Sequence, residues 1–202
     1  MGDYGDSILT GSPFVDRLLD YPLTRDSVNG YDKLRFAVEM GELERKIKSD
    51  PSRAPVYYYR IGNGLYNAST YGNSWYLISY SWASADIGRK EKYYYDKDYT
   101  GLKTAQQYFT IARRLSRNKE FKARCTFMLA KCYQKQILYP EYTSLFYNNY
   151  EKYEQALADY KTANVNNLYF KELTGLYSGT RFFAVAAGEC SYLKDFIRTY
   201  WR

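Results

Sequence analysis

The chain contains no histidine in its 202 residues. Histidine is the commonest general base near neutral pH and the usual ligand of zinc in proteins. Its absence excludes the Ser-His-Asp and Cys-His forms of nucleophilic catalysis and most zinc sites. The sequence therefore argues against an enzyme, and we expect neither a cofactor nor a bound metal.

Cysteine is scarce, and its three copies are not spaced as a redox or metal motif. Cys125 and Cys132 lie two turns apart on one expected helix, and Cys190 is far along the chain. Two helical turns span about 10 Å, which is too far for a disulfide. We expect all three to act as small, buried apolar residues.

Long apolar runs are also missing. No stretch of about 18 apolar residues occurs, so no membrane span is expected. The first residues lack a basic region followed by an apolar run, so they do not form a signal peptide.

Tyrosine and positive charge are abundant. The chain has 26 Tyr against 10 Phe and 3 Trp, and its net charge is +7. A buried Tyr ring packs like Phe but needs a partner for its hydroxyl, which favours wet helix grooves and recognition surfaces. The excess of positive charge permits contact with acidic proteins, anionic lipid or nucleic acid. A solvated, lysine-rich surface with no such partner explains the same charge equally well.

Apolar periodicity predicts an all-α chain. Residues 1–30 read as an extended N-terminal segment, in which Phe14-Val15 and Leu18-Leu19 form an apolar patch that could dock on the body. Residues 31–202 read as one helical, repeat-like domain. Helices are expected near 31–49, 55–71, 100–117, 120–137, 149–164, 168–177 and 180–196, with an exposed loop over 90–97.

Two helices share a pattern of small and large residues. Ala105-x3-Phe109-x2-Ala112 recurs as Ala156-x3-Tyr160-x2-Ala163. A second short motif precedes each copy: Ile61-Gly62-x2-Leu65 before the first and Leu129-Ala130-x2-Tyr133 before the second. Small residues let two helices approach closely, while the large residue fills the facing groove. These sequence motifs resemble those of the tetratricopeptide repeat. The resemblance implies an α–α superhelix of antiparallel helix pairs, in which 61–65 pairs with 105–112 and 129–133 pairs with 156–163.

The chain departs from that family in two ways. Long insertions separate the helices of both pairs, and no proline closes either unit at the expected place. The stretches 65–75, 146–153 and 189–196 further resemble the C-terminal part of uncharacterised exported Bacteroides-type proteins. This second resemblance implies a cell-envelope setting, rather than a cytoplasmic one, within a longer chain.

The candidate contact residues fall into two groups. Arg113, Arg114, Arg117, Lys119 and Lys122 surround one turn between helices, together with Arg124, and form an anion-binding candidate. A solvated helix end gives the same pattern. Tyr93, Tyr94 and Tyr95, with Tyr99 and the Trp75-Tyr76 and Trp82 positions, could stack on a glycan or instead fold back as packing.

Weaker motifs each have a structural interpretation. Asp96-x-Asp98 resembles the start of a calcium loop, but Gln107 stands where such a loop needs a glutamate. Gly62 and Gly64 match only part of a dinucleotide-binding motif, which needs a third glycine. Asn67-Ala68-Ser69 matches the N-glycosylation pattern but lies inside an expected helix. The neighbouring acids Glu42 and Glu44, or Glu151 and Glu154, carry no mark of a catalytic pocket.

The sequence as a whole predicts a non-catalytic scaffold that binds a protein or peptide partner. One alternative is a glycan-binding or glycan-processing accessory protein of the cell envelope. The other is a binder of anionic surfaces or nucleic acid, of which nucleic acid is the less favoured partner. A hydrolase would instead need two carboxylates about 5–10 Å apart in one pocket.

Overall fold

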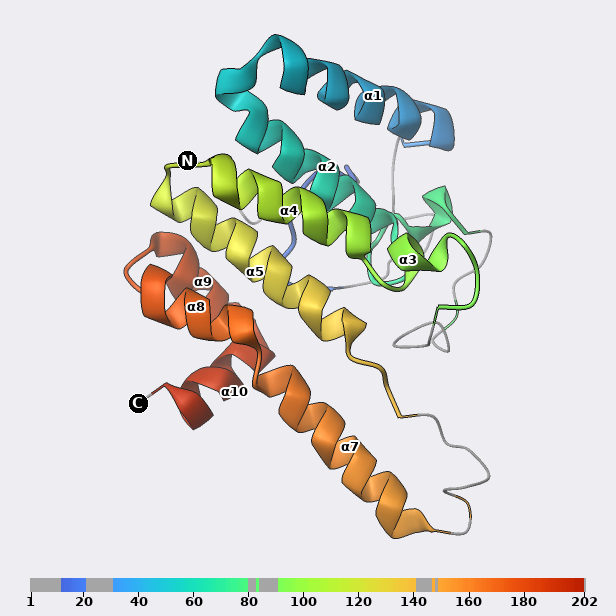
Figure 1. The fold of residues 1–202 in the computed structure, drawn as a ribbon, viewed down its shortest axis with the longest axis vertical. Helices are drawn as coiled ribbons and strands as arrows, with labels where there is room; N and C mark the ends of the chain where they lie inside the picture. The colour runs from blue at the N-terminus through green and yellow to red at the C-terminus, as the bar shows by residue number, and fades with distance from the viewer. Residues whose placement is uncertain are drawn as a thin grey trace.

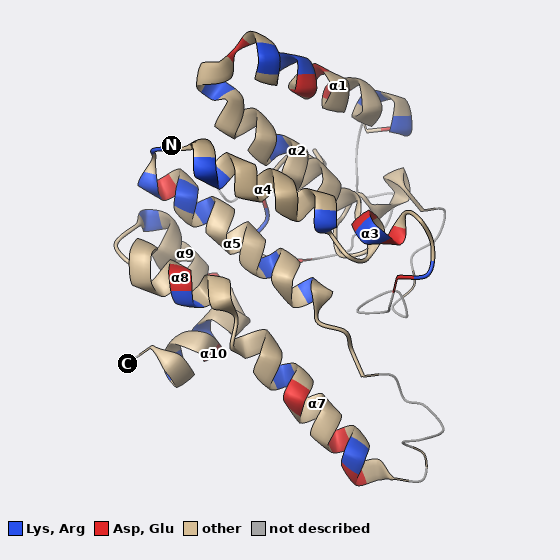
Figure 2. Ribbon diagram, viewed as in Figure 1, with Lys and Arg blue, Asp and Glu red and all other residues tan. Residues whose placement is uncertain are grey.

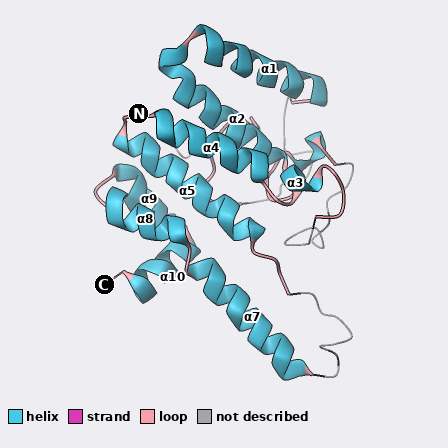
Figure 3. Ribbon diagram, in the orientation of Figure 1, coloured by secondary structure: helices cyan, strands magenta, loops and turns pink. Residues whose placement is uncertain are grey.

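The computed structural model describes residues 12–20, 31–79, 83, 91–140, 147 and 149–201. Every regular element in these ranges is helical, and none of them forms a strand (Figure 3). The all-α prediction is confirmed for this part of the chain. The elements are α1 (Lys33–Ser49), α2 (Ala54–Ala68), α3 (Asp96–Tyr99), α4 (Lys103–Leu115), α5 (Lys119–Gln136), α7 (Tyr150–Val165), α8 (Leu168–Tyr177), α9 (Arg181–Glu189) and α10 (Ser191–Tyr200), with short 3-10 turns at Pro51–Arg53 and Trp75–Leu77.

The helices begin where the sequence supplies side-chain caps. Asp32 accepts the backbone N–H of Arg35, and Asn118 accepts that of Phe121, at the starts of α1 and α5. Such caps satisfy amide groups that have no partner inside the helix. The helix expected over 180–196 is in fact two, because Cys190 leaves helical geometry between α9 and α10.

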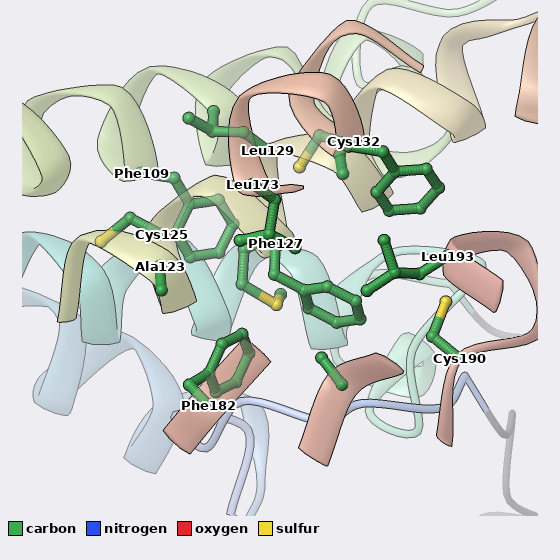
Figure 4. Close-up of a cluster of buried hydrophobic side chains, with 14 of the residues drawn as sticks. Phe109, Ala123, Cys125, Phe127, Leu129, Cys132, Leu173, Phe182, Cys190 and Leu193 are labelled. Atoms are coloured by element: carbon green, nitrogen blue, oxygen red, sulfur yellow. The ribbon is translucent and has the colours of Figure 1, made fainter. Parts of the chain in front are cut away.

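The helices stack side by side in chain order. In Figure 1, α1, α2, α4, α5 and α8 follow one another across the molecule, and the contacts between successive members are the most extensive among the described helices. Apolar side chains from α4, α5 and the C-terminal helices meet in one core (Figure 4). Its members include Phe109, Phe127, Leu129, Leu173 and Leu193.

The first expected helix pair is present. A Cβ placed on Gly62 of α2 would lie 2.7 Å from the ring of Phe109 in α4, so only glycine permits this approach. Ala105, Phe109 and Ala112 are all fully buried. The small and large residues therefore act as predicted in this pair.

The second expected pair is not formed. Helix α5 packs against α4 and α8, whereas α7 projects from the stack and makes its main helix contact with α10 (Figure 1). Ala156, Tyr160 and Ala163 of α7 are only partly buried. The prediction was wrong because α8, which follows α7 directly, supplies Phe170 and Leu173 to the core beside α5.

Burial also fixes the state of the cysteines. All three thiols are free and buried, and desolvation raises the pKa of each. Thiols in this state are poor nucleophiles. Among the described helices, none is long and apolar enough to cross a bilayer.

Candidate functional site

Residues 12–20 cross the faces of α2 and α5. We call them the N-terminal strap; Figure 1 draws them as a blue tube behind these two helices. The face that receives the strap is the α2–α5 groove, which we define by the polar residues that contact the strap. They are Tyr59, Asn63, Tyr66 and Asn67 of α2 and Arg124, Lys131 and Lys135 of α5.

The main chain of the strap is held by side chains of the groove. The Nδ2 of Asn67 donates to the carbonyl oxygens of Pro13 and Val15, each at 2.8 Å. Asn63 makes a longer contact of 3.5 Å with the carbonyl of Phe14. On the opposite side, Lys131 Nζ donates to the carbonyl of Arg17 at 2.7 Å. These bonds recognise an irregular or extended backbone rather than a particular side chain.

Asp16 occupies the first of two carboxylate positions in the groove. Its Oδ2 accepts a hydrogen bond from the Tyr59 hydroxyl at 3.0 Å and lies 3.5 Å from the guanidinium of Arg124. Burial raises the pKa of Asp16 despite these partners. Burial likewise raises the pKa of Tyr59 well above its ordinary value, so the phenol stays protonated and donates.

Asp20 occupies the second carboxylate position, between two lysines. Lys131 Nζ lies 2.7 Å from one of its oxygens and Lys135 Nζ lies 3.0 Å from the other. The Tyr66 hydroxyl contacts both oxygens at 3.0 Å. Burial opposes ionisation of Asp20, but the two lysines outweigh it and lower its pKa to about 2. This position therefore holds a charged carboxylate throughout the physiological pH range.

Helical periodicity explains how the two positions form. Tyr59 and Tyr66 are seven residues apart on α2, and Arg124 and Lys131 are seven apart on α5. Residues seven apart lie two turns along the same face of a helix. Each carboxylate thus meets one tyrosine from α2 and a cation from α5.

The expected docking of the N-terminal apolar patch is present, because Phe14 is buried and Leu18 packs against the main core. The polar contacts of the strap were missed from the sequence, although a signal was present. Arg124, Lys131 and Lys135 recur at steps of seven and four along a helix whose other inward residues are mostly apolar. Charged groups at the periodicity of a core face indicate buried ion pairs. The acids Asp16 and Asp20 lie at a matching interval in the N-terminal segment.

The predicted basic cluster is divided by the fold. Figure 2 shows basic residues gathered at the turn between α4 and α5. Arg114, Arg117 and Lys119 are exposed there and Lys122 is partly buried. Arg113 instead points to α8, where its Nη1 lies 2.6 Å from Glu172. Anion binding by the exposed members stays a prediction.

Tyr93, Tyr94 and Tyr95 of the predicted aromatic cluster are exposed and stack on one another, whereas Tyr99 is buried as packing. The rings of Tyr93 and Tyr95 stack with centroids 5.4 Å apart, and Tyr94 meets Tyr95 edge to face. The Tyr94 side chain is 92% exposed. The alternative that these rings fold back as packing is therefore wrong for Tyr94, while Trp82 lies outside the described residues.

The calcium-like motif has a structural role. Asp96 is fully buried, and its Oδ2 accepts the backbone N–H groups of Lys92 and Tyr93. Asp98 accepts the N–H of Thr104 at the start of α4. Both carboxylates thus close the loop before α4.

The remaining motifs also fall within the fold. Asn67 of the glycosylation pattern is 3% exposed, with its amide bonded to the strap. The acids Glu151 and Glu154 lie exposed on α7, and Glu42 and Glu44 lie on α1 with Glu44 exposed. The hollow that Glu151 and Glu154 border is lined by residues of α7 alone.

We found no match to a protein-family model, to a curated protein or to a solved structure.

Proposed function

We propose that this chain is a non-catalytic module that binds an extended segment of a partner protein in the α2–α5 groove. One observation carries the proposal: the groove already holds a nine-residue segment of polypeptide, partly through the main-chain carbonyls of Pro13, Val15 and Arg17. A surface built for a small substrate would direct its polar groups at one point. Here the hydrogen-bond donors follow the chain over the length of the strap.

The arrangement of helices supports a tetratricopeptide-like superhelix with altered pairing. Helix α2 packs with α4, α5 with α8, and α9 with α10, while α7 is an insertion. In such a stack alternate helices line one face, and α2 and α5 hold these positions beneath the strap. Solenoids of this kind use that face for binding extended partners. The resemblance of its sequence to exported proteins favours a cell-envelope setting for this function.

Selection from a displayed library of random peptides tests the proposal. The targets are the full chain and the same chain carrying Asp16→Asn and Asp20→Asn, which loosens the strap. We expect enriched peptides whose affinity falls at least tenfold on Asn67→Ala. The matched control Gln155→Ala, on the exposed face of α7, should leave binding unchanged. If no peptide is enriched on either target, or if Asn67→Ala has no effect, the proposal fails.

A second candidate function is glycan binding at the exposed tyrosines. The outward ring of Tyr94 offers a flat aromatic face, the feature on which sugars stack. A glycan array probed with the full chain and with Tyr94→Ala tests it. Binding that disappears with Tyr94→Ala supports this function, and an array without signal removes it.

A further inference from the structure

We infer that the α2–α5 groove selects acidic segments in which an aromatic residue is followed by carboxylates two and six positions later. Phe14, Asp16 and Asp20 give this spacing, and the strap holds the place of such a ligand within the chain. The inference rests on the proposed function and defines the chemistry of its ligand.

The interval between the two carboxylates matches the interval between the two positions that receive them. Two helical turns separate Tyr59 from Tyr66, a rise of about 10 Å. Four residues of extended chain reach at most about 14 Å, and the strap bends between Asp16 and Asp20. A ligand with its acids closer together or further apart would miss one of the two positions.

The aromatic position is as well defined as the carboxylate positions. Phe14 is 4% exposed and stacks on Phe36 with ring centroids 5.4 Å apart. A Cβ on Gly64 would lie 2.8 Å from the Phe14 ring, so glycine at this point of α2 makes room for an aromatic side chain. Arg60 lies over the same ring, 5.8 Å from its centroid.

Charge explains why the ligand must be acidic. The side chain of Lys131 is only 6% exposed, and that of Lys135 is 25% exposed. Cations buried to this extent are costly without a carboxylate partner. A neutral or basic peptide that displaced the strap would leave both lysines, and Arg124, without the carboxylates that they contact now.

The groove extends past the strap and leaves room for a longer ligand. A shallow hollow of about 450 Å³ lies beside Phe14 and Asp16, between α2 and α5. Val56 and Arg60 border it from α2, and Phe121 borders it from α5. A partner segment can therefore make contacts here that the strap does not make.

Fluorescence anisotropy with a labelled synthetic peptide of residues 12–20 tests this inference. The strap competes with the peptide in the unaltered chain, which lowers the apparent affinity in proportion to its occupancy. We expect the chain with Asp16→Asn and Asp20→Asn to bind the peptide at least tenfold more tightly than the unaltered chain. The single change Asp20→Asn, which removes the anionic partner of Lys131 and Lys135, gives the same comparison if the double variant does not fold.

Two further comparisons separate the inference from the proposed function. A peptide with asparagine at both acidic positions should bind at least tenfold more weakly. Lys135→Met should weaken binding of the acidic peptide at least fivefold. Lys161→Met, at an exposed position of α7, should leave that binding unchanged. If library peptides bind through Asn67 without acids at this spacing, the inference is overturned and the proposed function stands. If no peptide binds at all, both fall.

Discussion

Helices α4 and α7 carry the same pattern of small and large residues, yet only α4 is packed into a pair. Phe109 of α4 fits against Gly62 of α2, whereas the equivalent Tyr160 of α7 stays partly exposed. The difference shows that the pattern predicts a close helix contact only where a facing helix supplies the complementary residue. Helix α5 has that partner in α8, so α7 is left outside the stack.

The largest expected difference is between the two aromatic residues of the pattern. Phe109→Ala should lower the free energy of unfolding by about 3–5 kcal/mol, because it empties a fully buried site. Tyr160→Ala should lower the free energy of unfolding by only about 1 kcal/mol, since its side chain is only partly buried. Urea denaturation measures both, and equal losses would mean that α7 is packed as tightly as α4.

The close approach of α2 to α4 gives a sharper comparison. Gly62→Ala should destabilise the fold by about 1–3 kcal/mol, because the new methyl group overlaps the Phe109 ring. Gly175→Ala in α8 meets no atom within 4 Å and should stabilise by about 0.5–1 kcal/mol. Thermal unfolding of the two variants would contradict this interpretation if both shifts had the same sign.

A carboxylate in the groove should matter more than one on α7. Asp20→Asn should cost about 2 kcal/mol, because Lys131 and Lys135 then lack their anionic partner. Asp159→Asn on α7 should change stability by less than about 0.5 kcal/mol, as its contact with Gln155 is exposed. Chemical denaturation near pH 7 distinguishes the two variants. If Asp20→Asn leaves the free energy of unfolding unchanged, the strap is only loosely held.

Asp20 in the groove should also dominate the loss of stability at acidic pH. The folded pKa of Asp20 is about 2, below the value of about 4 for an unfolded aspartate, so its stabilisation is complete above pH 4. That stabilisation is lost as the pH falls from about 4 to about 2. Burial raises the pKa of Asp16, so its protonation acts in the opposite sense.

The measurement is the slope of unfolding free energy against pH. Between pH 4 and 2 the slope should be shallower for Asp20→Asn than for the unaltered chain, with a difference that adds up to about 2 kcal/mol over this range. Asp159→Asn serves as the control on α7. Identical slopes for all three chains would show that Asp20 is not held by the lysines.

Periodicity was enough to predict most helices because their signals are local. The steps of Phe36, Met40, Leu43 and Ile47 gave α1, and α8 was predicted at its observed bounds. The predicted pairing of α5 was wrong because neighbours in sequence need not be neighbours in space, and the small-large pattern lies in α7 and not in α8.

The contacts that form the α2–α5 groove could not be predicted from the sequence for a related reason. Asp16 and Arg124 are 108 residues apart, so no local pattern connects them. The need of buried tyrosines for hydroxyl partners was predicted in general, and Tyr59 and Tyr66 meet it with Asp16 and Asp20. Only the fold shows which acids serve which tyrosines.

The most direct test of the account is a crystal structure of the full chain carrying Asp16→Asn and Asp20→Asn, with an added peptide of residues 12–20. Selenomethionine in place of Leu19, which is 37% exposed in the strap, would locate the added peptide by its anomalous signal. The account predicts that the peptide lies along α2 and α5 with its carbonyls bonded to Asn67, and that the chain's own strap has left. A peptide bound elsewhere, with the strap still in place, would contradict it.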